Sequence, residues 1–255
     1  MLGMMSVSVS ANRGLTYSAP YMTPVIDGVA EDLWLAAEWT QVDLVYDGVS
    51  ESVCSARVKV MHDDQYIYFL AECTDGTIGG TDDAFEFYLD EDNCGMEGGY
   101  CEYATQLQIR LDGTVVKNGA SLSAADVDSV VAYEITTSEN GYVMEWAFAP
   151  LSGAPVDGAV WGLEFMYNDV DESNTFINAL RWNVDTAGGD VAPWQQVADF
   201  GEMTIEAYVA PVVEEPAVEE PAADAPVEAP VTADAGIVVA AVVMAAAAAV
   251  VCKKH

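Results

Sequence analysis

An all-β fold, an antiparallel β-sandwich of the jelly-roll type, is predicted for residues 24–208. Short runs rich in Val, Ile, Tyr, Phe and Trp recur along this stretch, and Gly, Asp and Asn separate them. No segment sustains a long helical period, although about two helical turns are expected at residues 31–37. Hydrophobic residues make up 52% of the chain, which is enough for a folded core.

The first strand pair is predicted within Ser52–Thr74, where two apolar runs are joined by a polar turn. If Asp63 and Asp64 form the tip of the hairpin, the numbers of any two residues that face each other across it sum to 127. Cys54 would then face Cys73 within disulfide reach. We therefore predict a Cys54–Cys73 disulfide, with two buried free thiols as the alternative.

A second disulfide, Cys94–Cys101, is predicted to close a Gly-rich loop. Two disulfides suit an oxidising compartment, and Cys252 is left over. The cysteine spacing offers no CxxC pair, which argues against a zinc site.

Alternation along three later strands assigns their side chains to two faces. The inward set is Phe85, Phe87, Leu89, Leu107, Ile109, Leu111, Tyr142, Met144, Trp146 and Phe148. The outward set is Glu86, Tyr88, Asp90, Gln106, Gln108 and Arg110. Carboxylate, amide, guanidinium and phenol groups on neighbouring strands suit a ligand with hydroxyl groups, and an ordinary solvated sheet face is the alternative.

Both ends of the chain indicate export. Residues 1–11 are similar to the end of a secretory signal, with an ordinary flexible terminus as the alternative, and residues 12–23 form a lead-in. Residues 209–235 are rich in Pro and acidic residues, which predicts an extended, disordered stalk.

Residues 236–252 are uncharged and apolar, and residues 253–255 are Lys-Lys-His. This pattern predicts one C-terminal transmembrane helix with a cytoplasmic tip, so that the domain is displayed outside the cell. A buried Ala-rich helix of the domain is the alternative.

The formal net charge of −34, from 42 acidic and 8 basic residues, excludes nucleic acid as a partner. Residues 24–208 hold 35 of the acids and five basic residues, which favours divalent cations or neutral ligands. Two segments, Asp90–Asn93 and Asn168–Glu172, are rich in the oxygen ligands that calcium prefers, with a polar turn as the alternative for each. Of these residues, Asp90, Asp92 and Asn93 form the candidate calcium site. The one histidine before the stalk, His62, lies on a predicted hairpin tip and does not suit a Ser-His-Asp system.

Several segments in series resemble one known family. They are Val25–Trp34, Ala56–Val60, Tyr66–Asp75, Asp82–Asp90, Leu107–Gly113, Tyr167–Asp171, Arg181–Asn183 and Trp194–Gly201. In this order they resemble the family 9 carbohydrate-binding modules and their DOMON-like relatives, here on a surface-anchored bacterial protein. The resemblance covers about 180 residues.

The resemblance implies a non-catalytic β-sandwich that holds a sugar ring between two tryptophans while polar side chains bond its hydroxyls. By position, it implies hydroxyl-binding roles for Asp75, Glu86, Arg110 and Arg181, and an aromatic wall at Trp194. The family's other wall precedes Asp83, but residues 76–81 contain no aromatic side chain. Either Tyr100 or Tyr103 supplies the second wall, or only the fold is kept.

We therefore predict a monomeric, extracellular, cell-surface-anchored module that binds a polysaccharide or oligosaccharide. Calcium is the only cofactor expected, and the C-terminal segment adds the membrane as a partner. A structural or adhesive domain that binds no sugar is the second hypothesis. A surface glycoside hydrolase is the third, because paired carboxylates are plentiful.

Overall fold

The computed structural model describes residues 12–48, 54–76, 78, 81–117 and 122–209. The chain divides into two units, Met1–Pro211 and Val212–His255. The predicted signal remnant 1–11, transmembrane segment 236–252 and cytoplasmic tip 253–255 lie outside the described residues, as does the predicted stalk except for Val209. Within the described residues, no helix is both long enough and apolar enough to cross a membrane.

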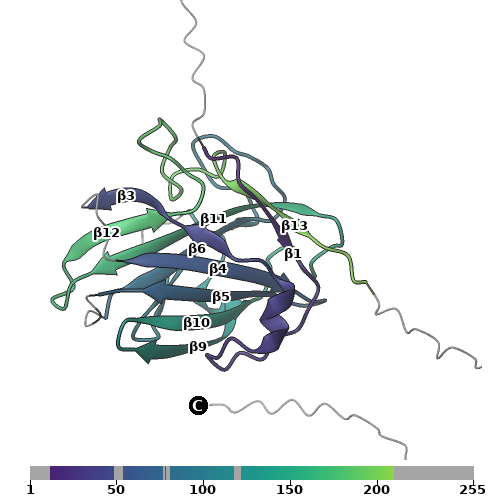
Figure 1. The fold of residues 1–255 in the computed structure, drawn as a ribbon. Coiled ribbons are helices and arrows are strands. Elements are labelled where there is room, and N and C mark those ends of the chain that lie inside the picture. Colours follow the sequence, from purple (N-terminus) through teal and green to yellow (C-terminus); the bar gives the residue numbers. More distant parts are fainter. Residues whose placement is uncertain (1–11, 49–53, 77, 79–80, 118–121, 210–255) are drawn as a thin grey trace, which may run out of the picture. The chain divides into compact units, whose positions relative to one another are not determined.

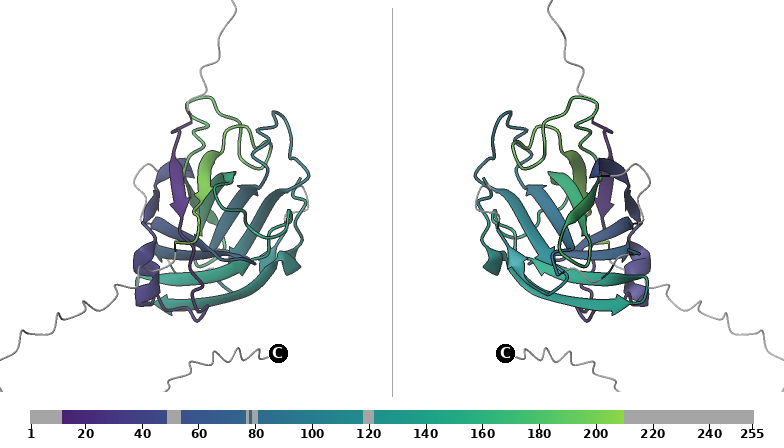
Figure 2. Two further views of the ribbon diagram at one scale, coloured as in Figure 1. Left: turned by 90° about the vertical axis from the view of Figure 1, so that its right-hand side faces the viewer. Right: turned by 90° about the vertical axis from the view of Figure 1, so that its left-hand side faces the viewer.

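The predicted all-β sandwich is confirmed, with two sheets that form two layers (Figures 1 and 2). The larger sheet comprises β1 (Thr16–Ala19), β13 (Gly201–Ile205), β11 (Val160–Val170), β6 (Ala84–Asp90), β7 (Ala104–Arg110), β8 (Val115–Val116), β12 (Phe176–Arg181) and β3 (Leu44–Gly48). The smaller sheet comprises, in order, β2 (Thr40–Val42), β4 (Ser55–His62), β5 (Ile67–Thr74), β10 (Gly141–Phe148) and β9 (Val130–Ser138). Two short 3₁₀ helices, η1 (Asp32–Ala36) and η2 (Val127–Ser129), complete the described elements.

Strand β11 organises the larger sheet because it has two partners on one side. Its first residues pair with β13, its last residues pair with β12, and β6 runs along its other side. The pairs are antiparallel except that β1 runs parallel to β13. Since β1 lies at Thr16–Ala19, part of the predicted lead-in 12–23 belongs to the sheet.

The core between the sheets is aromatic, as the alternation predicts. Phe85, Phe87 and Leu89 of β6 are fully buried in it, together with the inward residues of β7 and β10. The rings of Phe69 and Trp146 stack with centroids 4.8 Å apart, which joins β5 to β10. Each such ring removes a large apolar area from water, so this cluster supplies much of the stabilisation of the sandwich.

The hairpin of β4 and β5 forms, but the predicted Cys54–Cys73 disulfide is wrong. His62 pairs with Ile67 and Ala56 pairs with Cys73. The numbers of facing residues therefore sum to 129 and not to 127. The cause is the Asp63 carboxylate, which accepts the N–H groups of Gln65 and Tyr66 and thereby moves the tip to Asp64 and Gln65.

The two cysteines are consequently not opposed across the hairpin. Both are buried in the core and are not joined as a disulfide. Burial raises the pKa of the Cys73 thiol well above its usual range. The predicted Cys94–Cys101 disulfide is present, with the two Cα atoms 6.6 Å apart.

The outer face of each sheet is partly covered by segments without regular strands. Residues 20–39, which we call the cap segment, pack on the smaller sheet around Trp34. The loops 91–103 and 183–200 pack on the larger sheet around Tyr88. These coverings determine which parts of each outer face stay accessible.

Candidate functional site

A hollow of about 530 Å³ lies on the outer face of the larger sheet. Its lining comes from β6, β7, β11, β12 and two loops: Asp82, Glu86, Gln106, Gln108, Arg110, Met166, Asn168, Val170, Phe176 and Trp194. The polar members project outward because β6, β7 and β11 direct their alternate residues into the core. The hollow therefore combines amide, carboxylate and guanidinium groups with two aromatic rings.

Glu86 lies at the floor of the hollow and is only 3% exposed. Its Oε1 accepts a hydrogen bond of 2.7 Å from Nε2 of Gln106 on β7. Burial raises the pKa of Glu86, although the bonds from Gln106 and Asn168 and the charge of Arg181 oppose that shift. The hollow thus holds a carboxylate that is oriented before any ligand arrives.

Arg110 at the end of β7 forms an ion pair with Asp82, with 2.6 Å between Nη1 and Oδ1. The Nε of Arg110 is buried and has no hydrogen-bond partner among the described residues. The N–H groups of Thr81 and of Asp82 itself both donate to Oδ1 of Asn174, at 2.7 and 3.2 Å. The β11–β12 connection therefore supports the rim from which Asp82 faces the hollow.

Trp194 is half-buried and lines the hollow, as the resemblance implies. Tyr46 of β3 packs edge-to-face against it, with ring centroids 5.5 Å apart. The guanidinium carbon of Arg181 lies 3.5 Å from the ring centroid of Tyr46 and 5.2 Å from that of Trp194. Two rigid neighbours thus fix the position of the Trp194 ring.

Arg181 is fully buried and is not part of the lining. Its three guanidinium nitrogens have no hydrogen-bond partner among the described residues, and burial lowers its pKa. Its position beside Trp194 and Tyr46 gives it a positioning role for the aromatic wall. Its predicted role in bonding hydroxyls stays a prediction.

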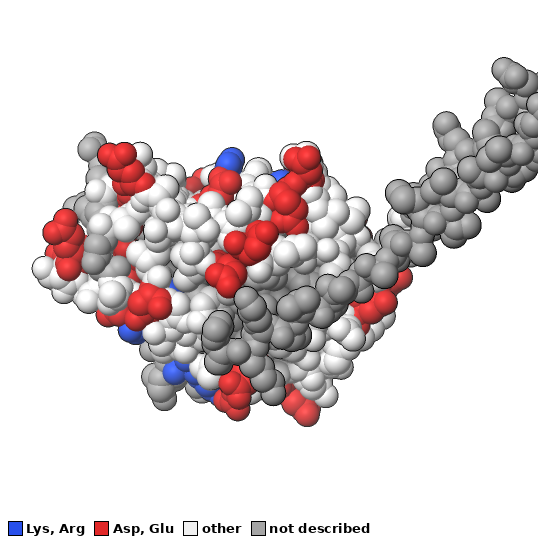
Figure 3. All heavy atoms as spheres, turned by 90° about the horizontal axis from the view of Figure 1, so that it is seen from below, with Lys and Arg blue, Asp and Glu red and all other residues white. Residues whose placement is uncertain are grey.

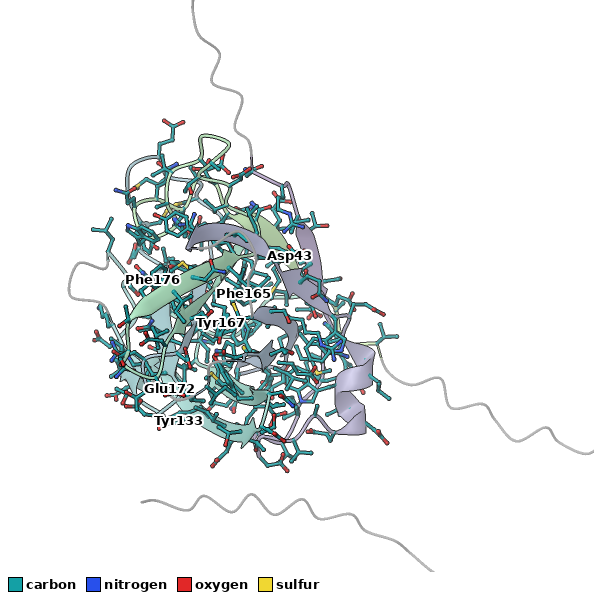
Figure 4. All side chains as sticks on the ribbon, turned by 60° about the vertical axis from the view of Figure 1, so that its left-hand side comes forward. Asp43, Tyr133, Phe165, Tyr167, Glu172 and Phe176 are labelled. Atoms are coloured by element: carbon teal, nitrogen blue, oxygen red, sulfur yellow. A yellow bond between two sulfur atoms is a disulfide. The ribbon has the colours of Figure 1, made fainter. Side chains whose placement is uncertain are left out.

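Phe176 is an aromatic residue of the hollow that the sequence did not reveal. It is 47% exposed and begins β12; Figure 4 shows it on that strand, away from Phe165 and Tyr167. Asp169 pairs with Asn178 but Val170 pairs with Phe176, so Ile177 is an extra residue in β12. This bulge brings Phe176 to the face of its partner Val170, which also lines the hollow.

The two tyrosines that the sequence offered as a second aromatic wall do not line the hollow. Tyr100 is half-buried, and its hydroxyl donates a hydrogen bond of 2.5 Å to the carbonyl of Pro193. It therefore supports the loop that carries Trp194. Tyr103, also half-buried, lies two residues after Cys101, outside the loop that the disulfide closes.

Asp75 does not join the other predicted hydroxyl-binding residues. It follows β5, is fully buried and accepts a hydrogen bond of 2.8 Å from the hydroxyl of Tyr167. Tyr167 belongs to the core between the sheets. Asp75 is not among the residues that line the hollow, and its implied hydroxyl-binding role stays a prediction.

The predicted calcium ligands Asp90, Asp92 and Asn93 form a tight turn after β6. The N–H of Asn93 donates to the carbonyl of Asp90, and that of Gly95 donates to Oδ2 of Asp90. The ligand atoms of Asp90 and Asp92 cluster with the sulfurs of Cys94 and Cys101, but those sulfurs form a disulfide. The turn thus offers calcium two neighbouring carboxylates, and burial raises the pKa of Asp90 to about 6.

One face of the domain, shown in Figure 3, carries many carboxylates and few basic side chains. Three of the five basic residues predicted for the domain form ion pairs: Arg57 with Glu72, Arg110 with Asp82, and Lys117 with Asp126. A surface of this sign disfavours anionic ligands and tolerates neutral ones.

Residues 26–207 match a family model described as "Carbohydrate family 9 binding domain-like". The chain is 25% identical over 197 residues to an exoglucanase, XynX, of Acetivibrio thermocellus. It is 27% identical over 195 residues to endo-1,4-beta-xylanase A of Thermotoga neapolitana. In both cases 74% of this chain matches 17% of the enzyme, so the chain spans a small part of the length of these relatives.

Two solved structures share the fold. One is a family 9 carbohydrate-binding module from Caldicellulosiruptor kristjanssonii in complex with cellotriose, with a TM-score of 0.65 and 25% identity over 78% of this chain and 97% of the module. The other is a family 9 module from the same organism in complex with glucose, with a TM-score of 0.64 and 25% identity over 76% and 97% of the two chains.

Proposed function

The chain belongs to the carbohydrate family 9 binding domains, and we propose that its β-sandwich binds an oligosaccharide or polysaccharide in the hollow on the larger sheet. The observation that carries this proposal is the combination of Trp194 and Phe176 with oriented polar groups in one hollow. Aromatic rings suit the C–H faces of sugars, while planar amide, carboxylate and guanidinium groups bond paired hydroxyls. The solved modules in complex with cellotriose and glucose support the same ligand class.

Within the hollow we assign the stacking surface to Trp194 and Phe176. Glu86, Gln106 and Arg110 supply the hydrogen bonds. The family's second tryptophan is implied just before Asp83, and here Phe176 takes that part from a different element, the start of β12. The Asn174 side chain bonded at Thr81 and Asp82 brings the two elements together.

We infer that the domain is non-catalytic. A glycosidase needs one carboxyl group to act as an acid and another as a nucleophile or base. The two carboxylates of the hollow are both engaged, because Glu86 accepts from Gln106 and Asp82 is paired with Arg110. Incubation of the chain with cello-, xylo- or manno-oligosaccharides should therefore release no reducing sugar.

Titration calorimetry of the full chain with cello-, xylo- and manno-oligosaccharides tests the proposal. We expect saturable binding of at least one of these series by the wild-type chain. No heat of binding from any of the three series would contradict the proposal. Measurable sugar release would replace it with the glycosidase hypothesis.

We also propose that the domain is extracellular and anchored to the cell surface through its C-terminus. Support comes from the sequence alone: the acidic Pro-rich stretch 209–235, the apolar stretch 236–252 and the lysines that follow it. Protease treatment of intact cells tests this, since an external domain is lost while a cytoplasmic marker survives. Survival of the domain under the same treatment would contradict the proposal.

A further inference from the structure

The disulfide between Cys94 and Cys101 closes a loop of residues 94–101, which we call the disulfide loop. Three of the six residues between the two cysteines are glycines. Two of these, Gly95 and Gly98, have positive φ angles of 59° and 69°. A backbone this rich in glycine has many accessible conformations, so the covalent bond at its ends is what restricts it.

The disulfide loop is bonded to the chain on both sides of Trp194. The hydroxyl of Tyr100 donates to the carbonyl of Pro193 at 2.5 Å. The backbone N–H of Gly98 donates to Oε1 of Gln196 at 2.9 Å. Pro193 directly precedes Trp194, and Gln196 follows it by two residues. The loop therefore fixes the backbone from which the Trp194 ring projects.

Two further contacts extend this support beyond the immediate neighbours of Trp194. The N–H of Val197, which is 3% exposed, donates to the carbonyl of Gly99 at 3.3 Å. The ring of Tyr100 packs edge-to-face on that of Phe200, with centroids 6.4 Å apart. The two segments thus form one packed and hydrogen-bonded unit, so a change in the disulfide loop reaches the aromatic wall of the hollow.

We propose that the Cys94–Cys101 disulfide strengthens sugar binding by holding Trp194 in its stacking position. This inference rests on the proposed function, because it assumes that Trp194 stacks on the sugar. When the disulfide opens, the loop gains conformational freedom, and ordering the Trp194 segment again becomes part of the cost of binding. The disulfide loop acts through Trp194 as a positioning element, since none of its residues lines the hollow.

The disulfide is accessible to a small reductant, because Cys94 is exposed. Cys54 and Cys73 are buried and are not joined as a disulfide, so the described part of the chain offers the reductant one target. Dithiothreitol gives the disulfide two electrons and two protons. It becomes a cyclic disulfide while the two cysteines become thiols.

The affinity of the full chain for sugar, measured with and without dithiothreitol, tests the proposal. The probe is whichever of the cello-, xylo- and manno-oligosaccharides the oxidised chain binds most tightly, and NMR titration gives the Kd under both conditions. We expect reduction to raise the Kd about fivefold, which is the cost of ordering one large side chain and its backbone. Removal of the reductant and reoxidation should restore the original Kd.

A double variant, Cys94→Ser with Cys101→Ser, locates the effect in this disulfide. It should have the Kd of the reduced wild-type chain, and dithiothreitol should leave that Kd unchanged. A response of the double variant to the reductant would trace the effect to another cysteine and overturn the proposal.

Tyr100→Phe tests the route from the disulfide to Trp194. It keeps the disulfide but removes the hydroxyl that bonds Pro193, so we expect a roughly twofold rise in Kd. Tyr103→Phe is the matched control, because Tyr103 is also half-buried but lies outside the loop that the disulfide closes. It should keep the wild-type Kd, and equal rises in the two variants would contradict the route through Tyr100.

Thermodynamic linkage gives a second readout that needs no variant. If the closed disulfide favours sugar binding, bound sugar must favour the closed disulfide by the same factor. In a fixed mixture of reduced and oxidised dithiothreitol, saturating sugar should raise the ratio of disulfide to dithiol chain about fivefold, counted by mass after the thiols are capped. A disulfide that only stabilises the fold would give the same ratio with and without sugar.

The proposal is overturned if the reduced chain binds sugar as tightly as the oxidised chain does, while the oxidised chain does bind. Failure of the oxidised chain to bind any of the three series would overturn the proposed function, and this inference with it. If the double variant does not fold, the effect of sugar on the disulfide ratio of the wild-type chain decides, and an unchanged ratio overturns the proposal.

Discussion

The outer faces of the two sheets both carry polar side chains, but the segments that pack on the two faces treat those side chains differently. On the smaller sheet the cap segment forms hydrogen bonds with buried charged side chains of β4 and β10. Glu145 of β10 accepts the N–H groups of Asp27 and Gly28 and the indole N–H of Trp34. Lys59 of β4 donates to the carbonyl of Trp34.

On the larger sheet the covering loops stop short. They bury Tyr88 and hold Trp194 at the edge, but leave Glu86 and Arg110 facing a hollow. The Nε of Arg110 has no hydrogen-bond partner among the described residues. The contrast teaches that alternation creates a polar face, whereas the segments that pack on it decide between a structural and a binding role.

The largest expected effect is on the covered face. Glu145→Ala removes the acceptor of three N–H groups on the cap segment and leaves those donors buried. We expect the free energy of unfolding to fall by about 3 kcal/mol, measured by chemical denaturation. The affinity of the folded fraction for sugar should change little. A loss of affinity as large as the loss of stability would contradict the assignment of separate roles to the two faces.

On the open face, Trp194→Ala removes a stacking surface. We expect a loss of about 2 kcal/mol in binding free energy, or roughly 30-fold in Kd, by calorimetry. Because Trp194 is half-buried, stability should fall by less than in Glu145→Ala. Unchanged affinity would show that Trp194 is only a structural residue.

Phe176→Ala tests the second aromatic surface. We expect a loss of about 1 kcal/mol in binding free energy, or a roughly fivefold rise in Kd. The loss is smaller than for Trp194→Ala because the Phe176 ring is more exposed than that of Trp194. The matched control is Tyr133→Ala, which removes an exposed ring from β9 of the smaller sheet. Equal losses in the two variants would contradict a specific role for Phe176.

The smallest expected effect concerns the pH dependence of the turn between β4 and β5, where Asp63 lies. Partial burial raises the pKa of Asp63, but bonds from Tyr68, Gln65, Tyr66 and Thr23 outweigh it, so the pKa is lowered. Asp63 therefore adds stability above the ordinary pKa of an aspartate, and this stability is lost as the pH falls through the lowered value.

Asp63→Asn keeps a side-chain acceptor and loses the charge. We expect it to cost about 0.5 kcal/mol of unfolding free energy at neutral pH. The difference from the wild type should vanish in strong acid, where the wild-type carboxyl is also protonated. A difference that stays constant with pH would show that hydrogen-bond geometry, and not the charge of Asp63, stabilises the turn.

The strand faces could be predicted because a period of two depends only on neighbouring residues. Phe85 and Phe87 are in the core, and Glu86 and Gln106 face outward, as the alternation requires. The hairpin register could not be predicted, since it depends on one side chain. The Asp63 carboxylate bonds to the turn and shifts the pairing that would have joined Cys54 to Cys73.

The hollow could be predicted only in part, because its residues come from distant segments. Glu86, Arg110 and Trp194 were found through a family resemblance, and the structure brings them together. Phe176 was missed because a bulge at Ile177 reverses its face, and a bulge leaves no mark in the alternation. The buried contact of Asp75 with the hydroxyl of Tyr167 could not be predicted, because Tyr167 belongs to a strand of the other sheet.

The most direct test of the central claim compares the indole N–H signals of the two faces by NMR during titration with cellotriose. We expect the Trp194 signal to shift and to saturate with the sugar. The Trp34 signal, whose N–H is bonded to Glu145 at 2.8 Å, should stay in place. A fixed Trp194 signal while sugar binds, or a shift confined to Trp34, would contradict the assignment of the binding site to the larger sheet.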